Sequence, residues 1–308
     1  MNLGRFEFIL ALVFLAFGYA ALGESVAEPA GKRATTQPTT VSGREVAHWT
    51  RLPFLAETAV EHGFEIPEPL GISGSYYTEK QNFEITDLKI GLGDDALLGI
   101  DKLIVAGDAR TRQTIWNSHF DCWLLPFLNV YGILGYMDGG AKIKLGPLGV
   151  PVYDFKLNYE GPVLGVGSTL AGGFRPFKDR STILFGQADL SHTTAFLDFD
   201  KLGLSLNEGV NALVLSLRVG MRDRIRTKLP LGEMHFALWG GTMCQAVQRV
   251  LPGHLEMLGL ALSVDKKACS PCNPIVGGRL EIGKNLDVMI EAGFGDRQSL
   301  MLMATYRF

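Results

Sequence analysis

Alternation of polar and apolar side chains is the feature that most constrains how this chain can fold. In the clearest stretch, residues 153–160, aromatic or apolar residues occupy the odd positions and polar residues the even ones. Successive side chains of a β-strand point to opposite faces, whereas a helix would mix the two sets on its surface. The same period of two recurs in the segments 112–124, 213–219, 276–282 and 287–294. The sequence therefore predicts an all-β protein.

Strand length and the placement of aromatic residues favour a membrane barrel over a soluble sandwich. Many candidate strands run about ten residues, which is enough to cross a bilayer at a tilt. The polar faces carry charges of both signs, which a closed barrel in lipid turns into its lumen. Aromatic residues fall near strand ends, where membrane interfaces favour them: Tyr136, Tyr153, Tyr159, Phe174 and Tyr306.

Thirteen candidate strands follow from this pattern. They lie near residues 70–78, 83–92, 112–125, 127–138, 149–160, 162–174, 180–191, 210–221, 234–247, 255–264, 275–283, 286–295 and 298–308. Single-chain bacterial barrels have an even number of strands. We therefore expect a transmembrane antiparallel β-barrel of about 12 strands over residues 70–308.

The first 23 residues have the layout of a cleaved signal peptide. Arg5 precedes an apolar run over 8–17, and Ala21-Leu22-Gly23 fits the small-x-small rule for cleavage before Glu24, with Ser25-Val26-Ala27 as a second option. The run is shorter than the roughly 20 residues that span a bilayer as a helix, so we expect cleavage. Export together with the barrel pattern predicts the outer membrane of a Gram-negative bacterium.

Two further segments precede the first candidate strand. Residues 24–47 contain prolines, glycines and threonines without a hydrophobic period, and we expect a flexible tether. In residues 48–69, Pro53 suits a first helical turn and Gly63 a helix end. We expect a short helix there, in the periplasm or as a plug in the barrel mouth.

The C-terminal residues repeat the alternation. Every second residue is apolar or aromatic, counting back from the end: Phe308, Tyr306, Ala304, Leu302 and Leu300. This pattern resembles the signal read by the barrel-assembly machinery, which can take it as a strand added at a sheet edge. We therefore expect that machinery and outer-membrane lipids as partners.

Three stretches carry a resemblance to a known family. They are Leu52-Pro53-Phe54 with Gly63 and Pro67, the segment 121–132 (DCWLLPFLNVYG), and GFGDR at 293–297 through Tyr306-Arg307-Phe308. Over most of its length from about residue 50, the chain resembles a family of largely uncharacterised proteobacterial outer-membrane barrel proteins. The resemblance implies an outer-membrane barrel, and it assigns no substrate and no catalytic residue.

The polar positions of the candidate strands define a predicted lumen. Its candidate residues are His119, Asp121, Asn129, Asp154, Lys156, Glu160, Arg218, Arg279, Glu281, Glu291 and Arg307. Charges inside a barrel can line a permeation path or bind a ligand, and they can also pair and fill the interior. We predict a channel or binding barrel for a small solute or lipid. The alternative is a structural or surface-interaction barrel with a closed, salt-bridged lumen.

A membrane-embedded hydrolase is a weaker hypothesis. Its local hints are Ser191-His192 and Ser118-His119 near Asp121. Neighbouring residues of one strand point to opposite faces, so Ser118 and His119 cannot form a nucleophile–base pair. We predict no catalytic residue, no metal and no cofactor, and the formal net charge of −3 gives no reason to expect nucleic acid.

The cysteines and one basic segment complete the predictions. We expect Cys269 and Cys272 to close a local disulfide in an extracellular loop. Cys122 and Cys244 fall on strands, as free thiols or as a cross-strand disulfide. The segment 221–233 contains four cations. We predict that it is either a solvated loop or, at an outward-facing rim, a grip for lipopolysaccharide phosphates.

Overall fold

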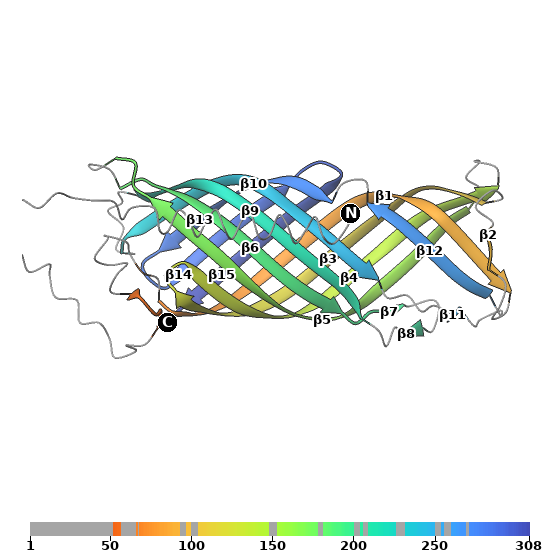
Figure 1. Cartoon of the computed structure of the whole chain (residues 1–308), viewed down its shortest axis with the longest axis horizontal. Coiled ribbons are helices and arrows are strands. Elements are labelled where there is room, and N and C mark those ends of the chain that lie inside the picture. Colours follow the sequence, from red (N-terminus) through yellow and green to blue (C-terminus); the bar gives the residue numbers. More distant parts are fainter. Residues whose placement is uncertain are drawn as a thin grey trace, which may run out of the picture.

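Ten strands form a closed antiparallel barrel within the part of the chain that the structure, a computed structural model, describes (Figure 1). The described residues are 52–56, 66, 68–92, 97–99, 104–147, 153–177, 181–199, 204–205, 209–225, 232–249, 254–255, 260–268 and 271–308. The barrel strands are β1 (Leu70–Leu92), β3 (Ile104–Leu125), β4 (Leu128–Pro147), β5 (Tyr153–Phe174), β6 (Ile183–Ala195), β9 (Val210–Ile225), β10 (Met234–Arg249), β13 (Cys272–Ile282), β14 (Leu286–Gly293) and β15 (Arg297–Arg307).

The barrel closes between its first and last strands. Each strand pairs with the next barrel strand along the chain, and β1 pairs with both β3 and β15. Backbone hydrogen bonds between Leu70 and Phe308 run in both directions at the end of this seam. Short strands lie in the connections: β2 (Leu97–Gly99), β7 (Asp198–Phe199), β8 (Leu204–Ser205), β11 (His254–Leu255) and β12 (Leu260–Ala268).

The thirteen candidate strands exceed the ten barrel strands by three, and each excess has an identifiable cause. The candidates 70–78 and 83–92 form the single strand β1, and 149–160 and 162–174 form the single strand β5. The candidate 255–264 overlaps β11 and β12, which lie outside the closed ring. The prediction of an all-β antiparallel barrel is confirmed, and the predicted number of strands is wrong.

Pro162 shows why a proline did not divide β5. It lies opposite Tyr136 of β4, and its carbonyl accepts a hydrogen bond of 2.9 Å from the backbone N–H of Phe196. The N–H and C=O groups of one strand residue point to the same side, so the missing N–H would face β6. Because β6 ends at Ala195, the proline lies just beyond the last regular pair of the β5–β6 ladder, and the missing N–H interrupts no ladder.

The strands differ greatly in length. β1, β3, β4 and β5 contain 23, 22, 20 and 22 residues, whereas β14 contains 8. The long strands run past the others at the end away from Phe308 (Figure 1). β15 pairs with β1 only as far as Gln81, and β12 takes its place along Phe83–Leu92. The barrel is therefore tall on one side and short on the other.

The segment before β1 differs from expectation. Of residues 48–69, the structure describes Leu52–Ala56, Ile66 and two residues before Leu70, and these do not support the predicted helix. The backbone N–H of Phe54 donates to the carbonyl of Leu124, which holds this piece at the end of β3. Among the described residues, no helix is long and apolar enough to cross a membrane. The predicted signal peptide and tether, residues 1–23 and 24–47, lie outside the described residues.

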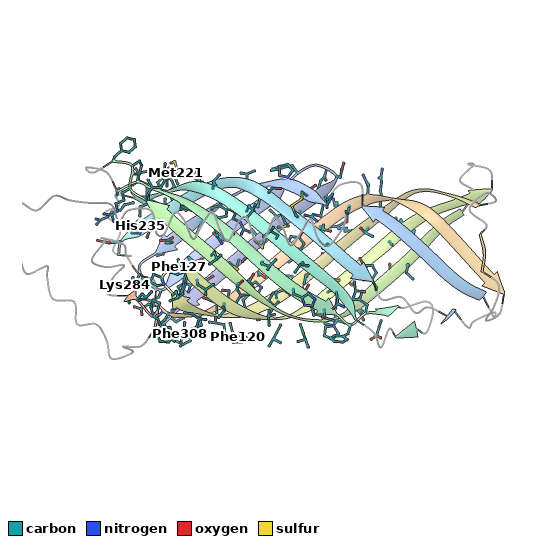
Figure 2. All side chains as sticks on the ribbon, in the orientation of Figure 1. Phe120, Phe127, Met221, His235, Lys284 and Phe308 are labelled. Atoms are coloured by element: carbon teal, nitrogen blue, oxygen red, sulfur yellow. A yellow bond between two sulfur atoms is a disulfide. The ribbon has the colours of Figure 1, made fainter. Side chains whose placement is uncertain are left out.

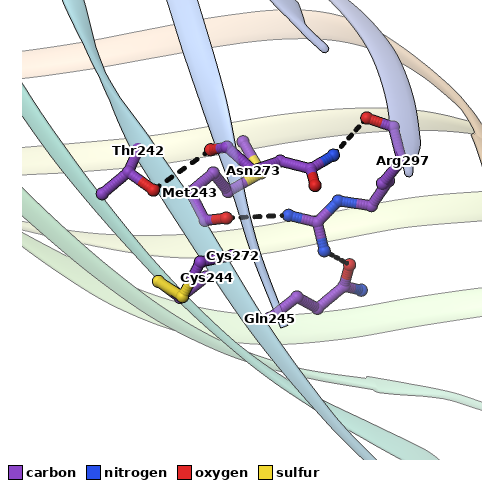
Figure 3. Close-up of a disulfide and its surroundings, with 7 residues drawn as sticks. All are labelled: Thr242, Met243, Cys244, Gln245, Cys272, Asn273 and Arg297. Carbon is purple, nitrogen blue, oxygen red and sulfur yellow. Dashed lines mark hydrogen bonds between the residues drawn. A yellow bond between two sulfur atoms is a disulfide. The ribbon is translucent and has the colours of Figure 1, made fainter. Parts of the chain in front are cut away.

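A disulfide joins Cys244 and Cys272, not Cys269 and Cys272 (Figure 3). Cys272 begins β13 directly opposite Cys244 of β10, with their Cα atoms 3.9 Å apart. The register of β10 against β13 brings the two thiols together, and the CxxC spacing gives no information on that register. Cys122 carries a free thiol, and Cys269 lies outside the described residues.

We expect proteolytic fragments of the non-reduced protein to show a Cys244–Cys272 cross-link by mass spectrometry. Replacing both cysteines with serine should lower the free energy of unfolding by about 3 kcal/mol, since the bond closes a loop between residues 28 apart. The Cys122→Ser variant is the control and should leave the cross-link and stability unchanged. A Cys269–Cys272 cross-link would contradict this pairing.

Candidate functional site

The inward faces of the strands form the candidate site. The pairing register places eight of the predicted lumen residues on this face: His119, Asp121, Asn129, Arg218, Arg279, Glu281, Glu291 and Arg307. These eight side chains gather into two layers along the barrel axis, and further inward-facing residues around Arg297 form a third.

The first layer lies at the end of the barrel that carries Phe308. Arg307 is 2.9 Å from Asp121, which also accepts a 2.7 Å hydrogen bond from Asn129. Gly71 lies on β1, between the strands of Asp121 (β3) and Arg307 (β15). A side chain there would overlap the Asp121 carboxylate, so the glycine lets Asp121 reach across β1. Asp287 extends the layer, with Arg307 at 3.9 Å and Arg279 at 3.7 Å.

A second group in this layer joins β9, β10 and β13. Arg222 lies 2.7 Å from Glu281, and His235 Nδ1 lies 4.0 Å from the same carboxylate. With the group around Asp287, these pairs place charges from β3, β9, β13, β14 and β15 across one end of the lumen.

The middle layer is built on a buried ion pair. Arg218 of β9 binds Glu291 of β14 through two hydrogen bonds, of 2.6 and 3.0 Å, and the side chains are 8% and 2% exposed. The indole N–H of Trp239 donates to the same carboxylate at 2.7 Å. The pair spans the intervening strands β10 and β13, on which Gly241 lies opposite Arg218 and Gly277 opposite Glu291.

A second carboxylate of the middle layer lies on β6, the strand next to β9. Asp189 accepts hydrogen bonds from Tyr131 at 2.9 Å and from Thr169 at 2.6 Å. The Tyr131 ring stacks with His119 and covers Gly167, where a Cβ atom would overlap it.

The third layer surrounds Arg297 (Figure 3). Its guanidinium donates to the Gln245 side chain at 2.6 Å and to the Met243 carbonyl at 3.0 Å, and it lies 3.7 Å from Glu79. Arg297 and Glu79 are 3% and 4% exposed. Tyr77 donates to Glu79 at 2.5 Å. The Arg297 carbonyl also accepts a hydrogen bond from Asn273, which ties the start of β15 to β13.

The outward face of the barrel has the opposite character. Its exposed apolar side chains include Phe120, Leu134, Leu164, Val166, Val219, Leu238, Val288 and Ile290. Aromatic residues mark both edges of this band: Phe127, Phe174, Tyr306 and Phe308 at one edge, and Tyr76, Trp116, Tyr136 and Phe196 nearer the other. Ion pairs inside and apolar side chains outside are the reverse of a soluble fold and match a barrel in lipid.

The protein is a bacterial outer-membrane β-barrel. Its orientation follows from the connections, because such barrels have short periplasmic turns and longer extracellular loops. Residues 126–127 and 283–285 form tight turns at the end that carries Phe308, and Figure 2 places Phe127, Lys284 and Phe308 there together. At the opposite end, longer stretches of sequence join the described ends of β1 and β3 (93–103), β6 and β9 (196–209), and β10 and β13 (250–271). We therefore assign the Phe308 end to the periplasm.

Two predicted lumen residues lie on the wrong face. Lys156 and Glu160 of β5 are exposed on the outer wall, on the same face as Leu164 and Val166. Beyond the hydrocarbon region, water surrounds the barrel, so apolar side chains turn inward and charges outward. The inward side here packs Tyr159 against buried Val163. Asp154 also lies in β5, but its side chain is outside the described residues.

The described residues also bear on the lipopolysaccharide and hydrolase hypotheses. Arg222 points into the lumen, and Arg224 pairs with Glu233 at the periplasmic end, so these cations of segment 221–233 do not face lipopolysaccharide. On β6, Ser191 faces inward and His192 outward, and on β3, Ser118 faces outward and His119 inward. Neither serine therefore shares a face with its neighbouring histidine. Within the described residues, no group of His, Cys, Asp and Glu side chains could hold a metal ion.

Several lumen residues were missed by the sequence reasoning: Glu79, Asp189, Arg222, Asp287 and Arg297. A signal for Arg297 was present, because counting back from Arg307 in steps of two reaches it through Thr305, Met303, Met301 and Ser299. Arg297 was left out because the last candidate strand was begun at residue 298.

No protein-family model and no curated protein sequence matches the chain, so the family resemblance stays a prediction. Solved structures similar to it include the transport unit of the autotransporter AIDA-I from Escherichia coli, with 10% identity, a TM-score of 0.35, and coverage of 82% of this chain and 96% of that one. The outer membrane protein OprG from Pseudomonas aeruginosa has 13% identity and a TM-score of 0.31, with coverage of 79% and 97%.

Proposed function

We propose that the protein is a surface-interaction barrel with a closed, salt-bridged lumen. The observation that carries this proposal is the burial of the Arg218–Glu291 and Arg297–Glu79 pairs inside the barrel, with every side chain less than 10% exposed. A side chain that water cannot reach does not line an open pore.

The size of the barrel supports the same conclusion. About eight strands enclose an interior that side chains just fill, and ten strands add little more. Arginine, tryptophan and tyrosine side chains extend from several strands into this space. Rings of Trp239 and Tyr159 lie against Gly277 and Gly139, where a Cβ atom would approach them to 2.6 Å. The lumen is packed as a core, and we propose that function resides on the ends and the outer wall.

A gated channel or binding barrel for a small polar solute is the second candidate. The polarity of the layers favours it, because a path along Asp121, Glu291 and Glu79 meets hydrogen-bonding groups at each level. Opening that path would require the buried pairs to separate.

Single-channel recording in planar bilayers tests the two candidates. We expect the refolded full chain to give no discrete conductance steps, with heat-modifiable gel mobility as evidence of folding. The Arg218→Ser/Glu291→Ser/Arg297→Ser/Glu79→Ser variant should conduct, because it removes the side chains that fill two layers. Steps in the wild-type protein that change when Glu291 is neutralised would overturn the closed-lumen proposal and favour the channel.

A further inference from the structure

Five cations gather on the outer wall near the extracellular end. They come from β1, β3, β4 and β5, and all are exposed: Lys80, Arg110, Arg112, Lys142 and Lys156. The strand register places them together, because Lys80 lies opposite Arg112, and Lys142 lies opposite both Arg110 and Lys156. They line a groove of ≈ 940 Å³, bordered by the β14–β15 turn at Gly295 and Asp296. We refer to these five residues as the cationic groove.

The cationic groove lies just beyond the aromatic edge of the membrane band. Tyr76 and Trp116 are in ring contact on neighbouring strands, with centroids 4.7 Å apart. Lys80 and Arg112 each lie four residues further along the same strands, toward the extracellular end. Four residues extend about 13 Å along a strand, which is roughly 10 Å in height for a tilted one. That height corresponds to the headgroup layer outside the hydrocarbon core.

The described residues that line the groove do not balance its charge. The acids lining it are Asp138 and Asp296, so the five cations leave a local excess of 5 − 2 = +3, in a chain whose formal net charge is −3. None of the five forms an ion pair with another described residue, whereas Arg218, Arg222 and Arg297 in the lumen each do. An exposed arginine pair and adjacent lysines suit phosphate oxygens, which guanidinium groups bind through paired hydrogen bonds.

We propose that the cationic groove binds the phosphate groups of lipopolysaccharide in the outer leaflet. The extracellular orientation, the height above the aromatic edge and the excess of positive charge among the described lining residues all match a phosphorylated headgroup. The site is on the outer wall, so the proposal does not depend on whether the lumen conducts. The proposed lipopolysaccharide contact is therefore the cationic groove and not segment 221–233. The described cations of that segment, Arg222 and Arg224, lie at the periplasmic end.

Two charge-matched variants test the proposal. The groove variant is Arg110→Gln/Arg112→Gln/Lys142→Gln. The control is Arg175→Gln/Arg224→Gln/Lys284→Gln, which removes the same charges from exposed positions at the periplasmic end. Heat-modifiable mobility should show that both variants fold. Binding of bisphosphorylated lipid A to the refolded full chain in neutral detergent is measured by native mass spectrometry, with dephosphorylated lipid A and inorganic phosphate as comparison ligands.

We expect the groove variant to bind bisphosphorylated lipid A roughly 10- to 100-fold more weakly than wild type, and the control variant to bind as wild type does. Dephosphorylated lipid A should bind wild type as weakly as the phosphorylated lipid binds the groove variant. Equal binding by the two variants would overturn the proposal. Equal binding of both lipids to wild type would show that the phosphate groups are not recognised, which would also overturn the proposal. Displacement of the lipid by millimolar inorganic phosphate would instead indicate a general anion site, and would overturn the assignment to lipid.

Discussion

Replacing Glu291 with leucine should destabilise the barrel by about 3–5 kcal/mol, because it leaves the Arg218 guanidinium buried without its counter-ion. The wild-type carboxylate accepts two hydrogen bonds from Arg218 and one from Trp239, and it is almost completely buried. Unfolding of the refolded protein in urea, followed by tryptophan fluorescence, measures the change.

The second substitution identifies the cause. An Arg218→Met/Glu291→Leu variant should recover most of the loss, since a buried ion pair replaced by apolar side chains of similar size is often close to neutral. The indole N–H of Trp239 would still lack an acceptor, which costs about 1–3 kcal/mol, and adding Trp239→Phe should recover that part. If the double variant were as unstable as Glu291→Leu alone, the buried charge would not be the source of the loss.

Replacing Phe308 with serine should remove most of the protein from the outer membrane of cells while leaving refolding in detergent intact. We propose that the barrel-assembly machinery reads the aromatic residue at the end of β15 as part of a strand added at a sheet edge. In the structure the Phe308 side chain points outward and is 57% exposed, so it contributes little to the folded barrel. Its backbone bonds with Leu70 do not depend on the side chain.

Phe127→Ser is the matched control. Phe127 is another exposed aromatic residue at the same periplasmic edge (Figure 2), but it lies in the β3–β4 turn. The measurements are the outer-membrane level in cells and the yield of heat-modifiable protein after refolding. Equal loss of both variants from cells, or failure of Phe308→Ser to refold in detergent, would contradict a role in recognition.

Much of the barrel could be predicted from the period of two. On β3, β9, β13 and β14, alternation alone separated the inward charges, such as Arg218 and Glu291, from the outward apolar residues. This worked because those strand segments cross lipid, where the environment on each side of the wall stays constant. The strand β5 leaves the lipid near Pro162, and from there the same alternation has the opposite meaning, so Lys156 and Glu160 were placed on the wrong side.

Other features depend on register, which alternation does not specify. The Cys244–Cys272 bond and the Arg218–Glu291 pair join strands whose alignment is set by the whole sheet. The reach of Asp121 over Gly71 to Arg307 depends on closure of the barrel between β1 and β15. The cationic groove likewise exists only because β1, β3, β4 and β5 continue beyond the bilayer in register, which places five scattered cations on one wall.

The pairing of β12 with β1 has a consequence for the crowded cell surface. Past Gln81, β1 has outrun β15, and its backbone N–H and C=O groups on that side would otherwise face water as a template for a strand from another molecule. β12 occupies that side from Phe83 to Leu92 with a strand of the same chain. The long connection between β10 and β13 therefore covers this edge of β1, and a strand from a neighbouring copy would meet the far side of β12, where the described pairing is limited to β11.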